Sequence, residues 1–301
     1  MASLREIRRK IKSVKSTQQI TKAMKMVAAA RMRKAQQAIV SSRPFAQRIE
    51  AAVQNLAKLE VHADLAARRE VQIHRYFDVR STGKVGLLLV TADKGLCGSF
   101  NTNILRLTLG WLKARRAEGK AIVVSAVGRK GRDLLNRLSE PGIEKAYELV
   151  GIFPKTHFAH AELAAKPLLE RFESGELESV SVLTTEFHSV ISQKVAEKRL
   201  LPIPAPEVKE GEAAPSDFKF EPGREKLLHA LLPRHAKAQV YRALLESQAA
   251  ELAARMNAMD SASKNAAELI GGLTLGMNRT RQAIITRELM EIVSGAEALA
   301  S

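Results

Sequence analysis

Apolar residues recur at helical spacing from the start of the chain. A first stripe, with intervals of three and four residues, is formed by Leu4, Ile7, Ile11 and Val14. The apolar positions then shift to a second row, formed by Ile20, Met24 and Val27. This shift predicts a stutter in the face that the helix presents to its partner. We expect a kink or boundary at Pro44, after which helical spacing resumes, and an N-terminal rod helix over residues 1–57.

The last quarter of the chain carries a second long helical pattern. A heptad-like series with many small or polar members is formed by Leu252, Met256, Met259, Ser263, Ala266, Ile270, Leu273, Met277, Thr280 and Ile284. A neighbouring row, Ile285, Leu289 and Ile292, completes it. The predicted helix over residues 226–301 would be roughly 100 Å long, which exceeds any ordinary domain core. We therefore expect it to pair with the N-terminal helix as a long antiparallel coiled coil.

The middle of the chain, residues 58–225, alternates between two kinds of pattern. Continuous apolar runs of strand length occupy residues 85–91, 121–127 and 180–185, and helical segments separate them near residues 103–118, 130–138 and 160–173. A further strand is predicted after Phe187, and an exposed loop over residues 204–217. Buried strands that alternate with helices predict a central α/β domain with a parallel or mixed sheet.

Charge changes the picture of the two terminal helices. The formal net charge is +16, and residues 1–43 hold twelve Lys and Arg against one acid, Glu6. This excess predicts an acidic partner, because like charges at helical spacing would otherwise destabilise the helix. Residues 226–301 are nearly balanced, with nine basic and seven acidic side chains, as expected for a helix that packs within protein.

Catalytic signatures are weak. The turn Asp93–Gly98 (DKGLCG) ends the first apolar run, and a tight turn with a buried thiol is favoured over a ligand site there. The GRKG segment at Gly128–Gly131 lacks the spacing of a phosphate-binding loop. The spacing of His157 and His160 favours solvated or capping roles over zinc. Hence no cofactor or metal is expected.

Four stretches carry a family resemblance. They read IRRKIKSVKSTQQITKAMKMVAAARMRKAQ, DKGLCG followed by Asn101, AQVYRALLESQAAELAARMNAM, and NRTRQAIITRELMEIVSGAEAL. Together they resemble the γ subunits of the rotary proton-translocating ATP synthases. The resemblance implies an α/β fold class, in which the N- and C-terminal helices form a long antiparallel coiled coil beside a central Rossmann-like domain.

The resemblance also implies a function and partners. The chain would be the non-catalytic central shaft that couples proton flow through the c-subunit ring to ATP synthesis or hydrolysis on the β subunits. Its partners would be the hexamer of α and β subunits, the ε subunit and the c ring, with one copy per complex and no nucleic acid. It would lie peripherally on the cytoplasmic side of a bacterial inner membrane.

Candidate contact residues follow from the same resemblance, position by position. Contacts with β are expected at Met24, Arg255, Arg281, Gln282 and Thr286. Contacts with the c ring are expected at Phe218, Phe220 and Glu221. A turn near β would contain Asp93, Lys94 and Cys97. Lys94 stands where many members of the family have Arg, which keeps the charge but not the bidentate geometry.

Two other classes of protein remain as alternatives. The basic N-terminal helix favours a nucleic-acid-binding helical hairpin, although the aromatic content of 4% and the balanced C-terminal helix speak against it. The central α/β pattern would also suit a nucleotide-binding enzyme of the doubly wound class, for which the isolated chain should bind ATP.

Overall fold

The computed structural model of this chain describes residues 3–66, 74–138, 141–206, 221 and 223–300. The chain forms two compact units. One, called here the terminal helix pair, contains residues 1–29 and 255–301, and the other, called the α/β unit, contains residues 30–254. The first helix, α1 (Leu4–Ala66), and the last, α5 (Arg224–Ala300), each contribute to both units.

The terminal helix pair is antiparallel, as expected. Lys25 of α1 contacts Asp260 of α5, and Gln18 contacts Ser263, so residue numbers rise on one helix as they fall on the other. On α5 the predicted series is confirmed, because its members from Met256 to Ile284 are all buried or partly buried. The row Ile285, Leu289 and Ile292 is exposed instead.

The predicted stutter in α1 is wrong. The face turned toward α5 keeps its regular spacing beyond Val14, at Gln18, Thr21, Lys25 and Ala28, and Met24 of the predicted second row is also partly buried. The apolar residues Ile20 and Val27 lie on the outside, with 58% and 50% of their surface exposed. Register here is set by continuous helical geometry and by the small residues of the seam, which override the local apolar pattern.

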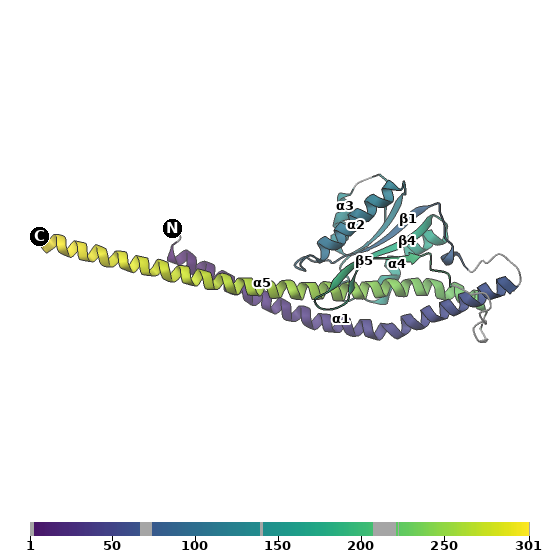
Figure 1. Ribbon diagram of the computed structural model, residues 1–301, viewed down its shortest axis with the longest axis horizontal. Helices are drawn as coiled ribbons and strands as arrows, with labels where there is room; N and C mark the ends of the chain where they lie inside the picture. The colour runs from purple at the N-terminus through teal and green to yellow at the C-terminus, as the bar shows by residue number, and fades with distance from the viewer. Residues whose placement is uncertain (1–2, 67–73, 139–140, 207–220, 222, 301) are drawn as a thin grey trace. The chain divides into compact units, whose positions relative to one another are not determined.

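The α/β unit is built on a five-stranded sheet with the order β3-β2-β1-β4-β5 (Figure 1). Its strands are β1 (Lys84–Val90), β2 (Ile122–Val127), β3 (Ile143–Leu149), β4 (Leu177–Phe187) and β5 (Gln193–Leu201). Strands β1 to β4 are parallel to one another, whereas the edge strand β5 pairs antiparallel with β4. The expectation of a parallel or mixed sheet is therefore confirmed, in its mixed form.

Helices cover both faces of this sheet. One face packs against α4 (Phe158–Glu173) and the sheet-proximal parts of α1 and α5, and also against the short helix η1 (Arg75–Phe77). The other face packs against α2 (Phe100–Ala117) and α3 (Arg129–Arg137). Within β1, Leu88 and Val90 face the first layer while Leu87 and Leu89 face the second. Burial on both faces explains why this strand reads as a continuous apolar run.

Two local features differ from what the sequence predicts. The edge strand β3 carries exposed charged residues at Glu144, Lys145 and Glu148, so its sequence lacks the apolar run of a buried strand. No helix boundary occurs at Pro44, where a kink or boundary was expected, because α1 continues on both sides of it. The predicted loop at residues 204–217 lies mostly outside the described residues.

Candidate functional site

Polar contacts hold the terminal helix pair together. The Lys25 ammonium lies 2.5 Å from an Asp260 carboxylate oxygen, and Lys264 lies 3.0 Å from the other oxygen. The hydrogen bonds from Lys25 and then Lys264 hold the pKa of the Asp260 carboxyl below its usual range. The Gln18 amide donates to the Ser263 carbonyl at 3.4 Å. The apolar part of the seam is small, with Ala28, Met259 and Ala266 as its buried members.

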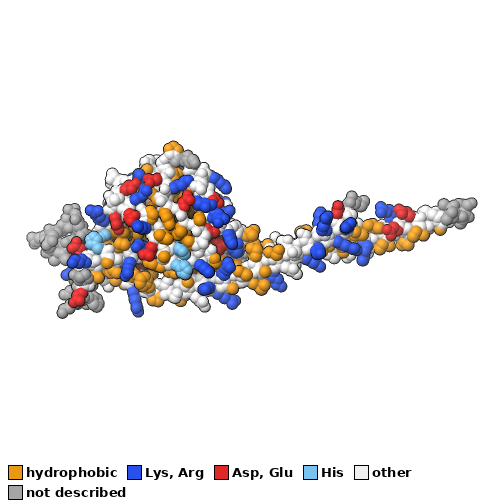
Figure 2. All heavy atoms as spheres, turned by 180° about the vertical axis from the view of Figure 1, so that it is seen from behind, with side chains coloured by type: hydrophobic (Ala, Val, Ile, Leu, Met, Phe, Trp, Pro, Cys, Tyr) orange, Lys and Arg blue, Asp and Glu red, His pale blue; other side chains and the backbone are white. Residues whose placement is uncertain are grey.

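The outer surface of this pair combines apolar and basic side chains. On α1 the apolar ones are Ile20, Val27 and Met26, the last 61% exposed. Lys and Arg side chains gather on the same helix nearer its start (Figure 2), where Arg5, Arg8, Arg9, Lys10, Lys12, Lys15 and Lys22 are exposed. Two members of the predicted second row, Ile20 and Val27, thus lie on the outer face, and Met24 is its one partly buried member. This outer surface offers a partner both an apolar contact and a positive field.

The end of α5 extends beyond the end of α1. Carrying the Gln18–Ser263 register back to Leu4 brings that residue opposite roughly residue 277, so no helix among the described residues continues beside the final turns of α5. Residues 281–296 are accordingly exposed, except partly buried Ile284. The apolar members of this exposed segment are Ile285, Leu289, Met290, Ile292 and Val293.

The predicted β-contact residues fall into two groups. Arg281, Gln282 and Thr286 lie in the exposed last turns of α5. Met24 and Arg255 are partly buried within the terminal helix pair. Of the predicted c-ring contacts, Phe218 and Phe220 lie outside the described residues, and Glu221 is exposed just before α5.

The turn after β1 is held by its own side chains. The Asp93 carboxylate accepts hydrogen bonds from the backbone amides of Arg129 and Gly151, each at 3.0 Å. Arg129 is the first residue of α3, so this carboxylate sits at a helix N-terminus, where a bound phosphate would otherwise lie. The Thr91 hydroxyl accepts from the amide of Gly131 at 2.8 Å. The GRKG segment thus serves to join α3 to β1.

Asn101 fixes the rest of this turn. Its amide oxygen accepts from the Ala92 backbone at 3.2 Å, and its nitrogen donates to the Lys94 carbonyl at 3.4 Å and to the Cys97 sulfur at 3.2 Å. Cys97 is buried, which confirms the prediction of a tight turn around a buried thiol. Lys94 and Leu96 are exposed, and Leu96 has a left-handed backbone with φ of 63°. The turn therefore presents one cation and one apolar side chain.

Histidine residues have local roles. The His160 ring accepts a hydrogen bond from the backbone amide of His157 at 3.1 Å at the start of α4, which confirms the predicted capping role.

No group of three His, Cys, Asp or Glu side chains with metal-binding geometry occurs among the described residues. In the same part of the chain, no helix has the length and hydropathy needed to cross a bilayer.

Comparisons with known proteins agree with this arrangement. The ATP synthase family model matches residues 3–299. The ATP synthase gamma chain of Anaeromyxobacter sp. (strain Fw109-5) is 48% identical over 99% of this chain and 100% of its own length. The gamma chain of Elusimicrobium minutum is 43% identical over 99% of each chain.

Solved structures show the same likeness. A chain of the central stalk and c ring of the Tetrahymena thermophila mitochondrial ATP synthase is 28% identical, with a TM-score of 0.57 over 81% of this chain and 99% of its own. A chain of the Euglena gracilis mitochondrial ATP synthase shares the fold at 20% identity, with a TM-score of 0.63 over 98% of this chain and 94% of its own. On this combined evidence, the chain belongs to the ATP synthase gamma chain family.

Proposed function

We infer that this chain is the non-catalytic central shaft of a proton-translocating ATP synthase. In that role it couples proton flow through the c ring to ATP synthesis or hydrolysis on the β subunits. The observation that carries this conclusion is the terminal helix pair, whose last turns of α5 continue alone with an exposed apolar surface. A surface of that kind in water favours a partner that surrounds it.

The β subunits are the proposed partners of the terminal helix pair. Arg281, Gln282 and Thr286 would contact them from the exposed end of α5. Met24 and Arg255 would contact them from the part of the terminal helix pair where α1 and α5 lie side by side. The basic outer surface of α1 suits acidic segments on β. Exposed ion pairs contribute only about 0–1 kcal/mol each, so such contacts can be exchanged from one β subunit to the next as the shaft turns.

In the turn after β1, different residues have different proposed roles. Lys94 is exposed and available to a partner, whereas Asp93 and Cys97 are engaged within the turn. We propose that Lys94 makes the contact with β and that Asp93 and Cys97 hold its backbone in place.

The remaining partners follow the same family assignment. We propose that the α/β unit rests on the ε subunit and the c ring, with Phe218, Phe220 and Glu221 toward the c ring. One copy of the chain would serve each complex, held peripherally at the cytoplasmic face of a bacterial inner membrane.

A labelled complex tests the shaft function directly. Ile191 is 88% exposed between β4 and β5, while Cys97 is buried, so an Ile191→Cys variant can be labelled selectively. With the α and β subunits fixed to glass and a bead on this position, ATP should drive rotation in one direction. A bead that stays still while the same complexes hydrolyse ATP would refute the shaft function.

A further inference from the structure

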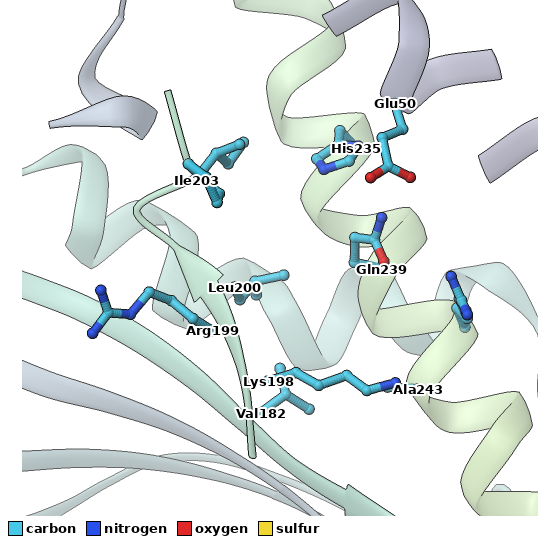
Figure 3. Close-up of a pocket in the computed structure, with 11 residues that line it drawn as sticks. Glu50, Val182, Lys198, Arg199, Leu200, Ile203, His235, Gln239 and Ala243 are labelled. Carbon is cyan, nitrogen blue, oxygen red and sulfur yellow. The ribbon is translucent and has the colours of Figure 1, made fainter. Parts of the chain in front are cut away.

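A cavity of about 260 Å³ lies in the α/β unit, away from the surfaces considered so far. Its walls come from Glu50 of α1, from β5 and the residues that follow it, and from one side of α5 between His235 and Ala243 (Figure 3). Such a volume is close to the lower limit of ordinary ligand pockets and suits a single ring with a short substituent.

The two sides of the cavity differ in chemistry. Val182, Leu200 and Ile203 line one side and are almost completely buried. Glu50, His235 and Gln239 stand on the opposite side, on the two helices (Figure 3). The cavity can therefore hold an amphipathic molecule, with its apolar body toward β5 and its polar head toward the helices.

His235 supplies a buried group without a partner. Only 8% of its surface is exposed, and its Nδ1 atom has no hydrogen-bond partner within the described residues. Burial lowers the pKa of this imidazole, against a smaller opposing effect of the Glu50 charge. At neutral pH the ring is thus uncharged and can accept a hydrogen bond from a ligand.

The charge on the polar side of the cavity favours a cation over an anion. Lys198 and Arg242 also line it, but both are bound to the Glu246 carboxylate, at 3.0 and 2.8 Å. Lys198 is in addition 2.8 Å from Glu186. The side chain of Arg199 points away from the helices (Figure 3). The charges of Lys198 and Arg242 are therefore balanced by these acids, while Arg199 lies on the side away from the helices and Glu50 places a negative charge at the polar side.

We propose that this cavity binds a small amphipathic cation, with an ammonium or amidinium head on one apolar ring. The head would pair with Glu50 and donate to the acceptors of Gln239 and His235, while the ring would pack on Leu200 and Ile203. The proposal does not depend on the shaft function, which its failure would leave untouched.

Ligand-observed NMR on the full chain tests the proposal, with benzamidine as the probe and benzyl alcohol and benzoate as matched neutral and anionic controls. Benzamidine should bind with a Kd below roughly 1 mM, benzyl alcohol more weakly, and benzoate least. Equal or tighter binding of benzoate would overturn the proposal, and so would the absence of binding by all three molecules.

A pair of variants locates the site. Glu50→Gln should weaken benzamidine binding about tenfold, because it removes a charge-assisted hydrogen bond. Glu60→Gln changes the same residue type on the same helix but does not line the cavity, so it should leave the Kd unchanged. An equal effect of the two substitutions, or no effect of either, would overturn the proposal.

Discussion

The α/β unit and the terminal helix pair stabilise themselves in different ways. In the α/β unit the large apolar side chains are buried on both faces of the sheet, as Leu88, Leu183 and Phe172 illustrate. In the terminal helix pair the buried positions are mostly small or polar, and large apolar residues such as Ile20 and Leu289 are exposed. The first arrangement serves the stability of the chain itself, and the second keeps apolar surface for partners.

The largest expected effect comes from comparing the same substitution, Leu to Ala, in the two regions. Leu168→Ala in α4 should lower the free energy of unfolding by about 2–5 kcal/mol, because Leu168 is fully buried in the core of the α/β unit. Leu269→Ala on α5 should change it by less than about 0.5 kcal/mol, since Leu269 is 52% exposed. Urea denaturation of the isolated chain measures both. Similar losses would contradict the comparison.

Acid should distinguish the two regions by the pH at which each loses stability. Burial lowers the pKa of His235 in the folded α/β unit, so the unfolded chain binds more protons below about pH 6.5, the ordinary histidine value. Stability should therefore fall as pH drops below that value, by at most about 1.4 kcal/mol per pH unit for this group. In the terminal helix pair, the depressed pKa of Asp260 predicts a loss only at lower pH, as the carboxylate becomes protonated.

Stability measured against pH checks this ordering. His235→Gln should flatten the curve between pH 5 and pH 6.5, roughly the range over which an ordinary histidine gains its proton. An unchanged curve would mean that other groups cause the acid sensitivity.

In the turn after β1, substitutions of Asp93 and Lys94 should have different effects on stability. Asp93→Ala leaves the amides of Arg129 and Gly151 without their acceptor and should cost about 1–3 kcal/mol of stability. Lys94→Ala should stay within about 0.5 kcal/mol, because its side chain is exposed. If Lys94 contacts β, its substitution should instead lower ATP-driven proton pumping by the assembled complex. Unfolding and pumping assays on both variants would show whether the two roles are separate.

Met24 gives a test in which stability should hardly change. Met24→Lys should alter the unfolding free energy of the chain by no more than about 1 kcal/mol, because the side chain is only partly buried. In the complex it should lower the protons pumped per ATP hydrolysed. Equal ratios in wild-type and variant membranes would contradict its assignment to the β contact.

The smallest expected effect concerns a helical glycine. A Cβ atom added at Gly272 would meet nothing within 4 Å in the chain, so Gly272→Ala should stabilise α5 by up to about 1 kcal/mol. Loss of assembly by this more stable chain would indicate that a partner approaches the backbone there. Thermal unfolding of the chain and co-purification of the complex measure the two effects.

Much of the fold could be predicted because its signals are local. The buried strands β1 and β2 are continuous apolar runs, and the helical series on α5 matches the buried face from Met256 to Ile284. The edge strand β3 escaped prediction because the exposed residues Glu144, Lys145 and Glu148 interrupt its apolar residues and leave no continuous run. The role of Ile20 and Val27 was misjudged because an apolar row does not reveal whether it faces the same chain or another one.

The Asp93 carboxylate at the start of α3 has a chemical consequence of its own. Any nucleotide that approached this edge of the sheet would have to displace an anion that is covalently tethered to the protein and already hydrogen-bonded to two amides. A tethered group has a high effective concentration that dilution does not lower, so ATP and inorganic phosphate compete poorly for the amides that it occupies.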